Sequence, residues 1–156
     1  MRVEEVMHHP VVTCSVDDNL GTAARLMWEQ DCGALPVVDQ DGRVNAMITD
    51  RDICMAAYTK GLRLEEIPVR SAMSKEQFSC HAADRVTEAE RLMREKQVRR
   101  LPVVDAEGRP LGILTLNDLA REAGRVPGRR AMAADADLLK TLAGVCGPHR
   151  GQVHAA

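Results

Sequence analysis

Apolar residues recur along the early part of the chain with two different periods. Leu20, Ala23, Ala24 and Met27 stand at positions i, i+3, i+4 and i+7, which is the spacing of one face of an α-helix. Two short apolar runs with β-branched residues follow, and an Asp-Gly turn between them predicts a β-hairpin. The runs are Leu35 to Asp39 and Val44 to Thr49, and the turn is Gln40-Asp41-Gly42.

The segments around the helix and the hairpin complete a predicted unit. An extended piece at Pro10 to Thr13 precedes the helix, Asp17 and Asp18 can cap its first turn, and Gly33 suits its end. A second helix is expected to begin after Thr49. The unit therefore reads β-α-β-β-α.

This unit is duplicated with one fixed offset. Leu35-Pro36-Val37-Val38-Asp39 returns 66 positions later as Leu101-Pro102-Val103-Val104-Asp105, and the offset holds from Met7 through Asp118 without insertion or deletion. A second unit is therefore predicted in the same order, and only Glu90 interrupts the apolar stripe of its first helix. Its predicted parts are an extended piece at Gln77 to Cys80, a helix with Val86, Ala89 and Met93 on one face, and a hairpin with the return strand Leu111 to Thr115. The fold class is α/β (α+β) with two paired halves.

The repeat divides the chain into three parts. The first repeat is assigned to residues 3–68, the second to residues 69–124 and a C-terminal tail to residues 125–156. Ala131 to Ala143 is compatible with a short helix, and the glycines near the C-terminus favour a loose end. Because each half is small, the two halves are expected to share one core.

A Thr-x-x-Asp motif follows the hairpin in each repeat. Thr49 and Asp52 form the first motif, and Thr115 and Asp118 form the second. One interpretation is purely structural, since this spacing is that of a capping box at the start of a helix. The other is a ligand site, because a helix N-terminus favours a phosphate, a Thr hydroxyl adds one hydrogen bond, and a carboxylate can accept two hydrogen bonds from a ribose cis-diol. The presence of two equivalent motifs favours the ligand site.

Composition narrows the classes of ligand and partner. The 156 residues include one Trp, one Tyr and one Phe, so no series of aromatic side chains is available for stacking on single-stranded nucleic acid. A formal net charge of −2 also disfavours binding to a phosphate backbone. No apolar run reaches the roughly 20 residues that span a bilayer. Glu4 and Glu5 stand where a signal peptide would be apolar, so we expect no membrane association and a cytoplasmic protein.

The cysteine and histidine positions do not form a metal-binding pattern. The five cysteines include no Cys-x-x-Cys pair, which argues against a disulfide framework and a zinc site. His8 and His9 are neighbours, and side chains of neighbouring strand residues point to opposite faces. We expect no metal ion. The sequence also has no P-loop and no nucleophile beside a base, so we expect no enzyme activity.

The paired motifs, each preceded by Leu-Pro-Val-Val-Asp, resemble two cystathionine-β-synthase (CBS) domains in tandem, a Bateman module. The resemblance covers about Val3 to Gly124. It implies that the repeats pack through their sheets with pseudo-two-fold symmetry and form two clefts for adenosyl ligands. AMP is the first choice, and ADP, ATP, NAD and S-adenosylmethionine are the others. Thr49 and Thr115 would bind phosphate, and Asp52 and Asp118 would bind ribose hydroxyls.

The resemblance also implies further binding residues. The backbone near Val12, Thr13, Ser79 and Cys80 would read the adenine edge, and Pro36, Val37, Pro102 and Val103 are candidate apolar walls for the ring. Arg51 is placed to reach a phosphate, and Asn117 replaces it in the second repeat. Arg100, next to Arg99, would clamp phosphate in one cleft only. The family favours Gly before the Thr motif, and Gly112 fits this pattern whereas Ala46 departs from it.

Together these features predict a regulatory module that binds an adenine nucleotide and signals to an unknown effector protein by a conformational change. The resemblance further implies a homodimer. The alternative is a constitutive dimerisation or scaffold module with no ligand, whose Thr-x-x-Asp motifs only cap helices.

Overall fold

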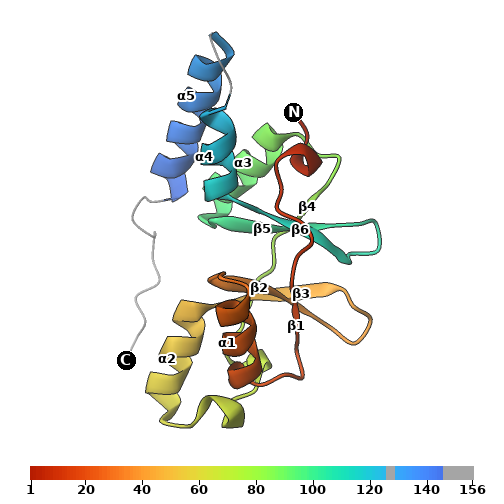
Figure 1. The fold of residues 1–156 in the computed structure, drawn as a ribbon, viewed down its shortest axis with the longest axis vertical. Helices are drawn as coiled ribbons and strands as arrows, with labels where there is room; N and C mark the ends of the chain where they lie inside the picture. The colour runs from red at the N-terminus through yellow and green to blue at the C-terminus, as the bar shows by residue number, and fades with distance from the viewer. Residues whose placement is uncertain (126–128, 146–156) are drawn as a thin grey trace.

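The computed structural model describes residues 1–125 and 129–145, and for 129–135 only the backbone. It contains two similar halves, each with a three-stranded sheet and helices on one side of that sheet (Figure 1). The two sheets face each other across the middle of the molecule, and the helices lie on the outside (Figure 1). Two tandem repeats of β-α-β-β-α order are therefore confirmed.

The first repeat is built around a hairpin with a short parallel strand at its edge. β1 pairs in parallel with β2, and β2 pairs in antiparallel fashion with β3. The elements are β1 (Cys14–Ser15), α1 (Leu20–Glu29), β2 (Ala34–Val38), β3 (Val44–Thr49) and α2 (Asp50–Lys60), with short 3₁₀ helices at Val3–Glu5, Leu64–Glu66 and Val69–Ser71.

The second repeat copies this order and adds one helix. Its elements are β4 (Cys80–His81), α3 (Val86–Lys96), β5 (Arg100–Val104), β6 (Pro110–Thr115), α4 (Leu116–Ala123) and then α5 (Arg129–Val145). The pairing of β4, β5 and β6 reproduces the register of the first sheet, including an irregularity between Val103 and Val104 that matches the one between Val37 and Val38.

Three local predictions were wrong. The first strand of each repeat is only two residues long and begins at Cys14 or Cys80, so Pro10 to Thr13 and Gln77 to Ser79 lie outside the ladders. Asn19, rather than Asp17 or Asp18, caps α1, because its side chain accepts a hydrogen bond from the Thr22 N–H at 2.9 Å. The Asp18 carboxylate instead accepts from Ser15 N at 2.8 Å.

Gly33 does not end the first helix. α1 ends at Glu29 with Gln30 as its C-cap, and Asp31 takes the left-handed conformation at φ 49°. Gly33 lies beyond this turn, where its carbonyl accepts the Asp50 N–H at 3.2 Å and so joins the entry of β2 to the start of α2.

The buried residues form two separate clusters, so the expectation of one shared core was wrong. One cluster holds the predicted stripe of Leu20, Ala23 and Met27, and the other holds Val86, Ala89 and Met93 of the second stripe. The halves exchange segments instead. Val3 is buried in the core of the second repeat, and its counterpart Val69 is buried in the core of the first.

Helix α5 covers the outer face of the second repeat by packing on α3 and α4 (Figure 1). It contains the predicted helical segment Ala131 to Ala143 and is longer than that segment. Thr141 and Val145 of α5 are buried against the repeat, and Arg94 of α3 donates to the Thr141 hydroxyl at 3.1 Å. Glu90, which interrupts the apolar stripe of α3, is buried on this face. The predicted loose end of the chain lies outside the described residues.

Candidate functional site

The first Thr-x-x-Asp motif stands where β3 ends and α2 begins. The Thr49 hydroxyl accepts from Asp52 N at 3.2 Å, and Asp52 Oδ2 accepts from Thr49 N at 2.9 Å, which makes a complete capping box. The Thr49 hydroxyl also donates to Asp52 Oδ2 at 2.7 Å. No hydrogen bond engages Asp52 Oδ1 within the described part of the chain, and the residue is half-buried.

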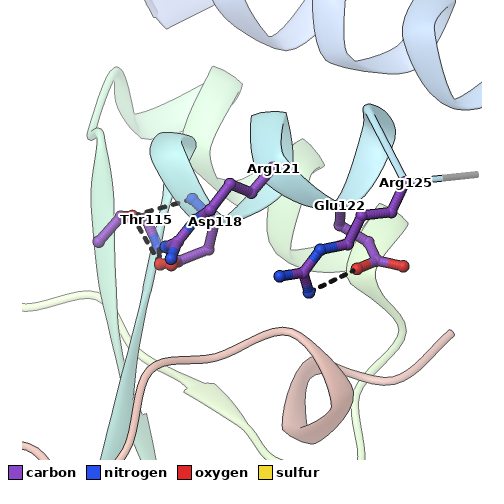
Figure 2. A network of polar contacts seen from close by, with 5 residues as sticks. All are labelled: Thr115, Asp118, Arg121, Glu122 and Arg125. Atoms are coloured by element: carbon purple, nitrogen blue, oxygen red, sulfur yellow. Dashed lines mark hydrogen bonds and ion pairs between the residues drawn. The ribbon is translucent and has the colours of Figure 1, made fainter.

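The second motif repeats this box between β6 and α4. Thr115 N and the Thr115 hydroxyl both donate to Asp118 Oδ2, at 2.9 and 2.6 Å, and Asp118 N donates to the hydroxyl at 3.2 Å. Here the other carboxylate oxygen is also occupied, because Arg121 forms an ion pair with Asp118 Oδ1. Figure 2 shows Arg121 reaching back along α4 to the carboxylate, and the Glu122–Arg125 ion pair one turn further on.

Each motif lies close to a chain segment that crosses from the other repeat. His8 and Ile113 of β6 exchange two main-chain hydrogen bonds, at 2.9 and 3.0 Å. Ser74 lies 66 positions after His8 and makes the equivalent crossing to Met47 of β3, where Ser74 N donates to Met47 O at 2.8 Å. The segment before Val12 and Thr13 therefore adjoins the second motif, and the segment before Ser79 and Cys80 adjoins the first.

Gly112 and Ala46 explain why the two crossings differ. A Cβ atom on Gly112 would lie 2.8 Å from the carbonyl oxygen of His8 and 2.9 Å from Met7 Sδ, so only glycine permits this approach. Ala46 occupies the equivalent place with a methyl group. There the second hydrogen bond runs from Met47 N to the Ser74 hydroxyl, at 3.0 Å, instead of to a main-chain carbonyl. Where the first repeat has Ala46 in place of glycine, the Ser74 hydroxyl therefore replaces the main-chain carbonyl as the hydrogen-bond acceptor.

The remaining predicted site residues lie at several depths. Val12, Thr13 and Ser79 are half-buried just before the short edge strands, and Arg51 and Asn117 are exposed in the first turns of α2 and α4. Pro102 is buried in β5, beside Val103. Cys80 is buried in β4, and burial with the nearby Asp84 carboxylate raises the pKa of its thiol to about 12. Cys14 has the same shift to about 12, from burial and Asp18, so neither thiol is a nucleophile at neutral pH.

Arg100 crosses from the second repeat to the first. It pairs with Thr115 in the sheet of the second repeat. A Cβ atom placed on Gly33 would lie 3.5 Å from a guanidinium nitrogen of Arg100 and 3.0 Å from Asp50 Oδ2. The guanidinium therefore stands near the N-terminus of α2, on the side of the first motif.

The two larger cavities are not lined by the Thr or the Asp of either Thr-x-x-Asp motif, although Asp50 within the first motif lines one of them. One of about 580 Å³ is enclosed by the N-terminal segment, α3, α4 and α5, and one of about 600 Å³ lies between α1 and α2. A third, of about 100 Å³, adjoins Asp118 and Arg121 and is also lined by His8. The cavity at the second motif is therefore smaller than a usual ligand pocket, which has a volume of about 300 Å³ or more.

Three residues at these sites were missed by the sequence reasoning. His8 was considered only as a metal ligand, and Ser74 and Arg121 were not considered at all. The duplication carried the signal in each case: His8 aligns with Ser74, and Arg121 aligns with Met55. Within the described part of the chain, no group of three His, Cys, Asp or Glu side chains is placed to hold a metal ion.

The arrangement of two duplicated hairpin–helix junctions has a direct parallel in known proteins. The family model described as the CBS domain matches residues 3–58 and again residues 69–125. The chain belongs to the CBS-domain family. It is 39% identical over 118 residues to the CBS domain-containing protein YhcV of Bacillus subtilis, a match that covers 76% of this chain and 82% of that protein.

Solved structures of tandem CBS domains share this fold. The structure of hypoxic response protein I with two coordinated zinc ions superposes with a TM-score of 0.71 at 32% identity, over 81% of this chain and all of that chain. The structure of CBSX2 in complex with AMP superposes with a TM-score of 0.67 at 25% identity, over 80% of this chain and 96% of that chain. Among the described residues of this CBS pair, none of the helices has both the length and the apolar character needed to cross a bilayer.

Proposed function

We propose that this CBS pair is a non-catalytic regulatory module that binds an adenine nucleotide, with AMP as the first choice. The observation that carries the proposal is the duplicated Thr-x-x-Asp junction, which places a hydroxyl and a carboxylate together at the N-terminus of α2 and again at that of α4. The likeness to CBSX2, which was crystallised in complex with AMP, supports an adenosyl ligand.

The first motif offers the groups that a nucleotide needs. Asp52 presents Oδ1, which no described group engages, as an acceptor for ribose hydroxyls. The N-terminus of α2 carries partial positive charge, and the exposed Arg51 and the crossing Arg100 add full positive charges for a phosphate. The backbone near Ser79 and Cys80 would read the adenine edge at this motif, and the backbone near Val12 and Thr13, with Pro102 as an apolar wall, would do so at the second motif.

Signalling requires that the nucleotide bind two arrangements of the module with different affinity. The crossings at His8 and Ser74 connect each motif to the other repeat, so a ligand at a motif contacts both halves. A shift in how the halves pack would then be transmitted to an effector protein. With AMP as the ligand, the module would respond to the adenylate pool.

A scaffold without ligand is the second candidate, and one observation favours it. Every capping-box hydrogen bond of both motifs is made within the chain, which is the behaviour of residues that only stabilise helix starts. The family resemblance implies a homodimer under both candidates, and Trp28 of α1 and Tyr58 of α2, which are 87% and 82% exposed, are candidates for its interface. Trp and Tyr are enriched among the residues that contribute most to binding at protein interfaces.

Isothermal titration with AMP, ADP, ATP, NAD and S-adenosylmethionine separates the two candidates. The regulatory module is expected to bind at least one of them saturably and to unfold at a higher temperature in its presence. No heat and no thermal shift with any of the five at millimolar concentration would leave the scaffold as the function.

A further inference from the structure

The two Thr-x-x-Asp carboxylates differ in what surrounds them. Asp118 is 5% exposed and both of its oxygens are engaged, one by Thr115 and the other by Arg121. Asp52 makes the same bonds to Thr49, but no described group engages its second oxygen. The duplicated sites are therefore not equivalent as acceptors for a ribose diol.

The difference originates in one substitution between the repeats. Arg121 lies three residues after Asp118, so its guanidinium reaches back one turn along α4 to the carboxylate (Figure 2). The equivalent residue on α2 is Met55, which carries no charge and is 46% exposed. The Arg121 side chain itself is 64% exposed, so its guanidinium can leave Asp118 for solvent without a rearrangement of the core.

The surroundings of Asp118 are also more closed. The N-terminal segment passes beneath α4 in Figure 2, and its residues Val6, Met7 and His8 line the cavity of about 100 Å³ beside Asp118 and Arg121. Gly112 lets His8 approach β6 through two main-chain hydrogen bonds. The segment is therefore held close to the second motif by main-chain hydrogen bonds, whereas Arg121 is held there only by its exposed side chain.

We propose that Arg121 is a latch on Asp118 that a nucleoside must displace, so that the cleft at Asp52 fills before the cleft at Asp118. The inference rests on the proposed nucleotide-binding function and assigns an order to its two sites. The ribose hydroxyls can bind Asp118 Oδ1 only after Arg121 has moved away. This movement breaks the ion pair between the exposed Arg121 guanidinium and the buried Asp118 carboxylate, which lowers the net affinity of the second site. Asp52 carries no such cost.

The duplication supplies the variants for a test. Arg121→Met installs the residue of the first repeat, and Met55→Arg installs the latch of the second. Asp52→Asn weakens the first site so that the second is measured on its own. Arg91→Met removes an equal charge from an arginine on α3 that is 66% exposed and pairs with Glu95 and not with Asp118, and so serves as the matched control.

Adenosine is the decisive probe, because it carries the ribose diol without a phosphate that an arginine would attract. In the Asp52→Asn background, Arg121→Met is expected to raise the affinity for adenosine by about 3- to 10-fold, whereas Arg91→Met leaves it unchanged. Met55→Arg in the wild-type background is expected to weaken the first site by a similar factor.

Loss of the latch and loss of nucleotide binding give different results. If wild type binds AMP and adenosine but Arg121→Met leaves the second site unchanged or weaker, the latch is wrong and the nucleotide-binding function stands. If neither wild type nor any variant binds AMP or adenosine at millimolar concentration, the proposed function fails, and the latch fails with it. Thermal unfolding of each variant shows whether its fold is retained.

Discussion

Gly112 and Ala46 occupy equivalent positions in the two repeats, but the segment that crosses from the other repeat packs against them differently. The Gly112 backbone has the His8 carbonyl against it, whereas Ala46 has a methyl group and the crossing segment there offers the Ser74 hydroxyl. The sequence marked this position as unusual through the glycine pattern. It could not show that the partner is a crossing segment, because that contact joins residues more than 100 positions apart.

Gly112→Ala is expected to destabilise the fold by about 1–3 kcal/mol, because the added methyl group overlaps a main-chain oxygen that is held by two hydrogen bonds. Denaturant unfolding followed by circular dichroism measures the change in free energy. Gly124→Ala is the control, since its Cβ atom would meet nothing closer than 3.7 Å. Equal stability of Gly112→Ala and wild type would contradict the close approach.

At the scale of elements, the apolar periods and the fixed offset predicted both hairpins and all four repeat helices, within a residue or two for the hairpin strands. The ends of the elements were harder to predict. The choice between Asp17, Asp18 and Asn19 as the cap depends on which side chain reaches the Thr22 N–H, and three adjacent polar residues give the same sequence signal. The place of α5 was not predictable from the apolar pattern, because its partners on α3 and α4 include the charged Glu90.

Glu90 gives the α3–α5 contact a dependence on pH. Burial and the nearby Asp137 raise the pKa of the Glu90 carboxyl, and Arg94 offsets part of the rise. The folded chain therefore holds this proton more tightly than the unfolded chain. The resulting stabilisation is present in full below the ordinary value of 4.5 and is lost as the pH rises through the folded value.

Glu90→Gln is therefore expected to be more stable than wild type at pH 7, by on the order of 1 kcal/mol, with the difference shrinking as the pH falls through the folded pKa toward the ordinary carboxyl value. Thermal unfolding at several pH values measures this trend. Glu107→Gln, at an exposed hairpin position, is expected to show no such trend. A Glu90→Gln variant that is less stable than wild type at every pH would contradict this account of Glu90.

At the scale of the whole molecule, the two repeats differ in what covers their helices. Helix α5 packs on α3 and α4, whereas no helix or strand of the described part of the chain fills the corresponding groove between α1 and α2, which has Trp28 among its lining residues. The sequence predicted two paired halves, but it predicted one shared core, and the structure has two. The sequence did not predict that Val3 is buried in the second core and Val69 in the first, because both residues lie outside the helices and strands whose apolar periods were used.

The open α1–α2 face is expected to be the contact between two copies of the chain. Light scattering after size exclusion should give a dimer for wild type and a monomer for the Trp28→Lys/Tyr58→Lys double variant, because two buried lysines without partners disrupt an apolar interface. Leu139→Lys changes an equally apolar side chain on α5 that is 64% exposed, and this variant should remain a dimer. A wild-type monomer at tens of micromolar, or a dimeric double variant, would contradict the assignment.

The central claim is that the duplicated Thr-x-x-Asp motifs bind a nucleotide, and its most direct test is an AMP titration of wild type beside the Asp52→Asn/Asp118→Asn double variant. Wild type is expected to bind AMP saturably. The double variant is expected to lose at least 10-fold in affinity while its circular dichroism spectrum is unchanged, since each lost charged acceptor is worth about 1.5–3 kcal/mol. Asp41→Asn, an exposed hairpin acid, should bind as wild type does. Binding by the double variant with wild-type affinity would place the ligand elsewhere and contradict the account.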